Sequence, residues 1–287
     1  MKEHDFIKII KNQTKSSYLG DDCAYLKELG IVVTQDNFIE NIHFKTDWAT
    51  PYQIGYKATA VNISDILASG AKPEYITIGL SLPNVSDNFI QEFYKGVAAA
   101  SPDVKVIGGD ITGSETIMVS ITAIGKTENR KIASRKNARE GFVVITNSLP
   151  GASSKGLKEL REGKKNTANI KAHLEPILDF KFSESISTQI DSDYAMMDTS
   201  DGLADALFQI AKASGVKISA KYIEGMFGAE DYNLVAAVPK EFLSKLKNYI
   251  IIGNVEKYEG HYLQIDNKFY SEYNELGLYD HFGEKND

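Results

Sequence analysis

The sequence contains one cysteine, Cys23, among its 287 residues. A single cysteine excludes a disulfide bond within the chain, which fits a reducing compartment such as the cytoplasm. Basic residues are also outnumbered: 32 lysines and arginines stand against 39 aspartates and glutamates, for a net charge of -7. Because nucleic acids and anionic membranes attract basic surfaces, this balance argues against both as partners.

Long apolar runs and the common nucleotide-binding signatures are missing as well. No apolar stretch approaches the length of a transmembrane helix, and the start, MKEHDFIKIIK, lacks the apolar core of a signal peptide. We therefore expect a cytoplasmic protein that binds no membrane. The stretch PGASSKG, residues 150–156, lacks the Gly-Lys-Ser/Thr ending of a P-loop, and no G-x-G-x-x-G follows a predicted strand. A nucleotide bound here would need metal ions at its phosphates.

What the chain does contain is an alternation of apolar strands and amphipathic helices. Its composition, 43% hydrophobic and 25% charged, is that of a globular protein, and its length indicates two domains. Strands are predicted at residues 30–36, 75–83, 104–110, 116–125, 142–149, 194–198, 216–223, 232–239 and 249–255, with a Gly-rich turn between the third and fourth and a hairpin at 261–273. Helices are predicted at the N-terminus and at residues 50–71, 87–101, 157–163, 170–182, 203–214 and 240–248. This interleaving predicts an α/β fold.

A polar stretch near the middle of the chain, residues 131–141, has no hydrophobic period. Such segments are typical of the connections between domains. We therefore expect an N-terminal domain over residues 1–135 and a C-terminal domain over residues 136–287.

Aspartates recur where apolar segments end or where a helix presents a polar face. They are Asp21, Asp22, Asp36, Asp65, Asp110, Asp198 and Asp201. Any one of them alone is more often a turn or helix-cap residue, and Ser200 or Asp201 could simply cap the helix 203–214. Together they favour a common rim that holds a hard divalent cation, Mg2+ above all. Asp205, one helical turn beyond Asp201, is expected to lie on the solvated surface.

Other candidates have two interpretations each. The glycines before Asp110 allow a close backbone approach to a ligand, or form an ordinary tight turn. His43 in ENIHF contacts a ligand or is structural. Arg135 clamps phosphate or is a solvated residue of the connection. The acidic surroundings of Cys23 raise a thiol pKa and so disfavour a nucleophilic role.

Seven motifs, taken together and in order, resemble those of the thiamine-monophosphate kinases. They are GDDCAYL, TQDNFIENIHF, GYKATAVNISDILASGAKPEYITIGLSLP, IGGDITGSE, MDTSDGLADAL, GAEDYNLVAAVP and LYDHF, and they span about residues 20–282. That family belongs to the superfamily of aminoimidazole ribonucleotide synthetase and selenophosphate synthetase.

The resemblance implies a fold, a reaction and an assembly. The fold has two mixed-sheet domains, of which the N-terminal one dimerises through its sheet. The reaction is transfer of the ATP γ-phosphoryl group to thiamine monophosphate, giving thiamine diphosphate, by direct in-line attack assisted by several Mg2+ ions. The expected partners are therefore thiamine monophosphate, ATP and a second copy of the chain.

The resemblance also implies roles for individual residues. The metal ligands it implies are Asp22, Thr34, Gln35, Asp36, Asp65, Asp110, Asp198 and Asp201, of which Asp110, Asp198 and Asp201 also count as catalytic. The nucleotide contacts are Tyr94, Gly109, Arg135 and Ser200. The contacts to thiamine phosphate are His43, Glu230 and Tyr279.

Three positions depart from the family pattern. Gln35 replaces a common Thr, Ala229 replaces a Gly, and Ala152 replaces an Asp. The segment between Ala152 and the sequence HLEP is also shorter than in many relatives. Two alternatives stay open: another ATP-dependent enzyme of the superfamily, and a non-catalytic nucleotide- or metal-binding homologue.

Overall fold

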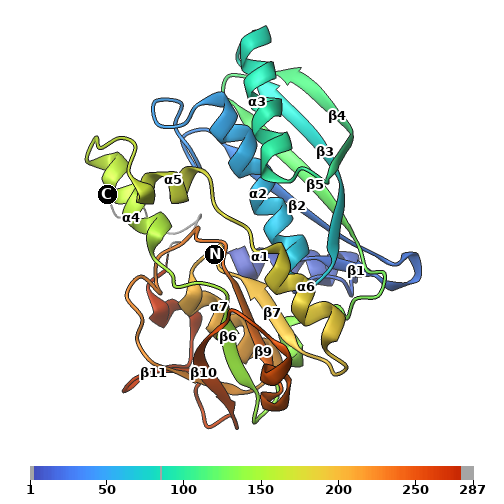
Figure 1. Cartoon of the computed structure of the whole chain (residues 1–287), viewed down its shortest axis with the longest axis vertical. Coiled ribbons are helices and arrows are strands. Elements are labelled where there is room, and N and C mark those ends of the chain that lie inside the picture. The colour runs from blue at the N-terminus through green and yellow to red at the C-terminus, as the bar shows by residue number, and fades with distance from the viewer. Residues whose placement is uncertain (1–2, 85, 279–287) are drawn as a thin grey trace.

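The computed structural model describes residues 3–84 and 86–278, with side chains from Phe6 onward. Tyr279 lies outside the described residues. Two mixed sheets, each with helices packed on it, make up the described chain (Figure 1). No helix in this part is long and apolar enough to cross a membrane.

The first sheet comes from the N-terminal half of the chain. Within the described residues its strand order is β1 (Ala24–Leu26), β2 (Ile31–Ile39), β5 (Met118–Lys126), β3 (Lys72–Leu82) and β4 (Lys105–Gly113). All neighbours are antiparallel except β3 and β4, which are parallel. Helices α2 (Pro51–Ala68) and α3 (Asp87–Ala100) cover one face, and β4 forms an outer edge (Figure 1).

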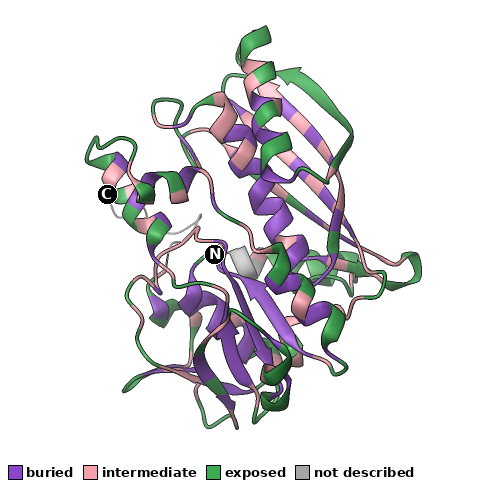
Figure 2. Ribbon diagram, in the orientation of Figure 1, coloured by how far each residue is buried: buried purple, intermediate pink, exposed green. Residues whose placement is uncertain are grey.

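Helix α2 is the central element of the molecule. It begins with a capping box in which the Thr50 hydroxyl accepts a hydrogen bond from the Gln53 amide at 3.3 Å, followed by Pro51 at the first turn. Almost every residue beyond the first turn is buried (Figure 2), since α2 packs against strands of both sheets. A helix buried on all sides places any polar side chain it carries inside the protein.

The second sheet comes from the C-terminal half. Its order, again within the described residues, is β12 (Lys268–Tyr270), β11 (Leu263–Ile265), β8 (Lys217–Ala220), β10 (Ile250–Glu256), β6 (Val143–Thr146), β9 (Leu234–Val238) and β7 (Ala195–Asp198). The remaining helices are α1 (Glu3–Thr14), α4 (Ala152–Arg161), α5 (Ala168–Leu174), α6 (Phe180–Gln189) and α7 (Leu203–Ser214).

The predicted α/β fold with two mixed sheets is confirmed. The division between residues 135 and 136 stays a prediction. The two sheets fall on either side of it, but one core cluster crosses it and includes Ile63 of α2, Ile186 of α6 and Met196 of β7. The next residue, Met197, faces the second core cluster, because successive side chains of a strand point to opposite faces.

Several local predictions were wrong. The helix predicted at 157–163 begins earlier, as α4 at Ala152, where the amides of Gly151 and Ser153 donate to the Asp231 carboxylate at 2.6 and 2.9 Å. The single helix predicted over 170–182 is two helices, α5 and α6, since Pro176 lies between them and cannot continue a helix.

The strand predicted at residues 104–110 is present as β4, whereas the helix predicted at 240–248 differs. The pair Gly108–Gly109 lies inside strand β4 and is not a turn. A β-carbon at Gly109 would lie 2.0 Å from the Ile78 carbonyl oxygen, so glycine is required there by the neighbouring strand. Residues Lys240–Lys245 form a short 3-10 helix where an α-helix is predicted.

Candidate active site

Three carboxylates from distant parts of the chain meet between the two sheets. Asp22 precedes β1, Asp65 lies on α2, and Asp198 ends β7. One oxygen of each lies within 4.8 Å of the others. We call these three residues the acid triad. The sequence predicts that aspartates from separate apolar segments share a common rim, and these three lie together.

Hydroxyl groups orient the acid triad. The Thr34 hydroxyl donates to Asp65 Oδ2 at 2.6 Å, and the Ser64 hydroxyl donates to Asp198 Oδ2 at 2.6 Å. The Ser200 amide donates to Asp198 Oδ1 at 3.2 Å. The chain after β7 therefore turns back onto the carboxylate that ends the strand. The residue at the cap position of α7 is Gly202, which has no side chain, so neither Ser200 nor Asp201 occupies that position.

The triad carries more negative charge than its surroundings tolerate. Burial, followed by the charge of the nearby Asp22 carboxylate, raises the pKa of Asp198 to about 7. Burial likewise raises the pKa of Asp65, with Asp36 and Asp198 adding to the effect. The Arg135 guanidinium lies 2.7 Å from Asp22 Oδ1. Burial lowers the pKa of Arg135, but the charge and hydrogen bond of Asp22, together with the charges of Asp205 and Asp198, outweigh burial and raise the pKa overall.

These residues fit a hard divalent cation. The donor set consists of carboxylate oxygens from Asp22, Asp65 and Asp198, with Asp36 close enough to Asp65 to raise its pKa. Oxygen donors of this kind suit Mg2+, and a cation would offset the repulsion that the raised pKa values report.

Asp205 was wrongly expected on the surface. It is 3% exposed, and burial followed by the Asp201 charge raises its pKa to about 7, while Arg135 lowers it. Gln209 Nε2 donates to Asp205 Oδ1 at 3.3 Å. The first turn of α7 is covered by the segment around Tyr273, far along the chain. No local feature of the sequence indicates that this segment covers Asp205.

Two predicted metal ligands lie away from the triad. The side chain of Gln35 bonds to Ser120 and Thr122 on β5, at 3.4 and 3.1 Å. Asp110 is exposed on β4. In register, Asp36 on β2 lines up through β5 and β3 with Gly109 on β4. Three strand spacings make a separation of roughly 14 Å.

The predicted nucleotide contacts also fall into two groups. Arg135 and Ser200 lie at the acid triad. Gly109 lies on β4, and Tyr94 lies on α3 with its ring edge-on to Phe93 at 5.3 Å between centroids. One chain thus gathers Arg135 and Ser200 around the triad and places the other two on β4 and α3.

The predicted acceptor contacts that are described form a second group near α2. Lys57 Nζ lies 3.1 Å from Glu230 Oε1. His43 Nδ1 accepts from the Ile39 amide at 3.0 Å, and the Phe38 ring lies 5.5 Å from the His43 ring and 6.0 Å from Lys57 Nζ. Burial raises the pKa of Glu230, but the charge and hydrogen bond of Lys57 and the smaller effects of His173 and His43 together outweigh burial and lower the pKa.

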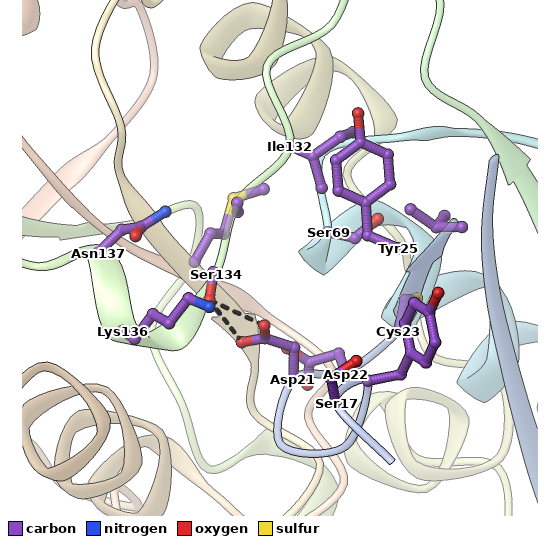
Figure 3. A pocket seen from close by; sticks show the side chains of 14 residues that line it. Ser17, Asp21, Asp22, Cys23, Tyr25, Ser69, Ile132, Ser134, Lys136 and Asn137 are labelled. Carbon is purple, nitrogen blue, oxygen red and sulfur yellow. Dashed lines mark hydrogen bonds between the residues drawn. The ribbon is translucent and has the colours of Figure 1, made fainter. Parts of the chain in front are cut away.

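A cavity of about 340 Å³ opens beside the triad (Figure 3). Asp22 forms part of its wall, together with Asp21, Lys136 and Asn137. The Ser134 hydroxyl donates to Asp21 at 2.8 Å, which joins the segment before β1 to the connection between the sheets. Cys23 is buried in this wall, and burial followed by the Asp65 charge raises its pKa, which fits the predicted lack of a nucleophilic role.

Comparison with known proteins identifies the family of this chain. Residues 20–127 match the family model described as AIR synthase related protein, N-terminal domain. A thiamine-monophosphate kinase from Aquifex aeolicus is 33% identical, over 90% of this chain and 92% of that protein. Another from Bacillus subtilis is 32% identical, over 86% of each chain. A solved structure, AaThiL complexed with AMPPCP and TMP, is 30% identical, with a TM-score of 0.87 over 98% of this chain and 97% of that one.

The chain belongs to the thiamine-monophosphate kinase family. The resemblance seen in the motifs and the prediction of a kinase are thereby confirmed. The roles of individual residues in this kinase stay predictions. Sequence reasoning missed Lys57, Ser64 and His173, which the structure places against predicted site residues.

We expect the metal-free kinase to lose stability as pH rises from about 4 to about 7. Asp198 and Asp205 have raised pKa values of about 7 in the folded chain, against an ordinary value of 3.8. Between these values the folded state binds more protons than the unfolded state, so stability falls as pH rises. Urea unfolding with EDTA at pH 5 to 8 measures this slope, and Mg2+ should flatten it. Stability that rises over this range in EDTA would contradict the prediction.

Proposed function

We propose that this chain transfers the γ-phosphoryl group of ATP to thiamine monophosphate, giving thiamine diphosphate and ADP. The observation that supports this most is the acid triad, built in a member of the thiamine-monophosphate kinase family. AaThiL, which is similar along nearly the whole chain, binds both AMPPCP and TMP in its complex. We place the reaction in the cytoplasm.

The chemistry that follows is mainly electrostatic. Mg2+ bound at the triad would reduce the repulsion between two anionic substrates and between developing charges on the transferred group. The chain orients its carboxylates through the hydroxyls of Thr34 and Ser64. Arg135, paired with Asp22 at 2.7 Å, presents a guanidinium fork beside them that suits a phosphate oxygen.

No general base is needed in this proposal. The acceptor is itself a phosphate and is largely ionised at neutral pH. Its oxygen can attack the γ-phosphorus in line, so that the residues of the chain act by holding the two groups in position. Asp198 accepts two hydrogen bonds and belongs to the predicted ligand set, which makes it a poor nucleophile for a covalent route.

The acceptor heterocycle would bind at the group near α2. Glu230 keeps a lowered pKa there and is therefore ionised at neutral pH, which suits an amino group or a cationic ring. His43 accepts at Nδ1 from the Ile39 amide, so in its neutral form it carries its proton on Nε2. Tyr279 is proposed as a stacking partner for the ring, by its place in the family motif.

We further propose a homodimer formed at strand β4. All residues of this edge strand are exposed, including Val106, Ile107 and Ile111 at 47 to 54%. An exposed edge strand with apolar side chains is a template for pairing with another chain. A second copy placed there would supply Tyr94, Gly109 and Asp110 to a site that one chain leaves without them.

Measuring ADP release with each substrate omitted in turn tests the function. We expect ADP to form only when thiamine monophosphate, ATP and Mg2+ are all present, with thiamine diphosphate in equal amount. ATP consumption with an amide acceptor in place of thiamine monophosphate would point to another enzyme of the superfamily. ATP binding without turnover would point to a non-catalytic homologue.

A further inference from the structure

Lys57 is a charged residue in the interior of the protein. It lies near the middle of the buried helix α2 and is 2% exposed. Its ammonium nitrogen lies 3.1 Å from Glu230 Oε1. Burial lowers the pKa of Lys57, and the Glu230 charge acts in the opposite direction. A lysine is rarely placed so deep unless it is paired, and here its partner belongs to the other half of the chain.

The other oxygen of Glu230 faces a second buried group. His173 Nδ1, on α5, lies 3.5 Å from Glu230 Oε2, and the Ser153 hydroxyl on α4 lies 2.9 Å from the same nitrogen. His173 is 4% exposed, and burial followed by the Lys57 charge lowers its pKa to about 4. The imidazole is therefore neutral at neutral pH. We call Lys57, His173, Ser153 and Glu230 the Glu230 cluster.

Three helices thus position the Glu230 carboxylate, and the backbone of this residue is constrained as well. Glu230 has φ +66°, and Tyr232 has φ +52°, both in the left-handed region that side chains other than glycine disfavour. The Glu230 amide donates to the Ser200 carbonyl at 2.7 Å, which ties this segment to the loop after β7. The Glu230 side chain stays 24% exposed, so part of it faces outward from the cluster.

This arrangement orients the Glu230 carboxylate more than it stabilises the folded protein. A buried ion pair is often no more stabilising than apolar side chains of the same volume, because both charges lose their water. What apolar side chains could not do is hold a carboxylate ionised and aimed to one side. The Glu230 cluster does both, with one positive charge, one negative charge and a neutral imidazole.

Helix α2 also connects this cluster to the acid triad. Lys57 and Ser64 are seven residues apart, so they lie on the same side of α2 and about 10 Å apart along its axis. Ser64 donates to Asp198 of the triad, as Lys57 pairs with Glu230. One rigid helix thus sets the separation between the carboxylates at the phosphoryl end and the carboxylate at the acceptor end.

We propose that Lys57 and His173 are positioning residues, which hold the Glu230 carboxylate in the orientation that binds the heterocycle of the acceptor. This inference rests on the proposed function. It adds two residues that have no predicted contact with substrate and act only through Glu230. The prediction is therefore one of dependence: the effect of Lys57 on acceptor binding should disappear once Glu230 has no charge to orient.

The experiment compares four full-length proteins: wild type, Lys57→Met, Glu230→Gln and the double variant. For Lys57→Met we expect the KM for thiamine monophosphate to rise about 10-fold or more, with kcat changed less than about 3-fold and the KM for ATP unchanged. Glu230→Gln should behave alike. In the double variant the KM should equal that of Glu230→Gln alone, since groups that act as one unit are non-additive. Calorimetric titration with thiamine monophosphate in the absence of ATP compares the binding affinities of the four proteins without turnover.

The double variant also covers the case in which Lys57→Met fails to fold, because it removes both charges of the buried pair. Lys217→Met is the matched control: Lys217 is buried too, with Glu256 and Glu259 at 2.8 and 2.9 Å, but belongs to strand β8. It should lower thermal stability and leave both KM values unchanged.

Two results would overturn the proposal. One is a Lys57→Met effect that adds fully to that of Glu230→Gln, because Lys57 would then act on its own. The other is an equal rise of KM for both substrates, which a general loss of structure produces. Failure of the proposed function would look different, since wild type itself would show neither turnover nor calorimetric binding of thiamine monophosphate.

Discussion

Replacing Asp65 by asparagine is expected to remove most of the activity while making the metal-free protein more stable. Asp65 belongs to the acid triad, where its oxygen lies within 4.8 Å of those of Asp22 and Asp198. The amide oxygen of asparagine can still accept from the Thr34 hydroxyl, which now donates to Asp65 at 2.6 Å. The substitution therefore deletes a charge and a predicted metal ligand with little change of shape.

The loss of activity should be large because metal ligation supplies several kcal/mol at the transition state, and each 1.36 kcal/mol is tenfold, so kcat should fall roughly 10³-fold. The gain in stability follows from the raised pKa of Asp65, which burial and the charges of Asp36 and Asp198 produce. In wild type without metal, stability is lost as pH rises through that pKa. Asparagine does not ionise, so the advantage of the variant should grow with pH.

Urea unfolding in EDTA at pH 6 and pH 8.5, together with steady-state kinetics in Mg2+, measures both effects. Asp191→Asn is the control, since Asp191 is 95% exposed and 3.6 Å from Lys245. That variant should keep wild-type activity and stability. An Asp65→Asn protein that is less stable than wild type in EDTA at both pH values would show that the carboxylate is held by contacts other than those described.

The ends of helices could be predicted from the sequence where capping residues mark them. Helix α2 begins at its Thr50 cap, and α7 ends before Gly215, as predicted. The predictions failed where distant packing decides. Asp205 is covered by a segment that follows about seventy residues later, and no periodicity within α7 reports it.

The candidate site shows the same division. Asp22, Asp65 and Asp198 could be predicted because each stands at the polar end or polar face of an apolar element. Lys57 could not, since a lysine in an apolar helix gives no sign of its partner, and Glu230 lies 173 positions later in the numbering, on a strained loop. The pairing depends on how α2 crosses the second sheet, which is a tertiary property.

Asp110 is a predicted metal ligand that lies away from the acid triad of its own chain. The resemblance groups it with Asp36 as a metal ligand, yet the structure places it on the exposed edge strand β4, with β5 and β3 between it and the strand of Asp36. Both statements hold together if Asp110 acts in the site of a second copy. The homodimer proposed at β4 supplies that copy.

Mixing two inactive variants, Asp36→Asn and Asp110→Asn, is therefore expected to restore activity. Each homodimer lacks one acid in both of its sites and should be nearly inactive. In a hybrid dimer one site carries both substitutions and the other carries neither. Random exchange of subunits gives half hybrids, each with one intact site of two, so about a quarter of the wild-type activity should return.

The control pairs Asp36→Asn with Asp65→Asn. The backbone amide of Asp36 donates to Asn62 of α2 at 3.0 Å, and Asp65 lies on that helix, so these two acids belong to one chain's site. Every site of that hybrid keeps one substitution, and no activity should return. Exchange is carried out by mild denaturation and dilution, and native mass spectrometry measures the hybrids formed. If hybrids of Asp36→Asn and Asp110→Asn form in the expected proportion and stay inactive, Asp110 does not complete the site across a β4 dimer, and its predicted role as a metal ligand loses its structural basis.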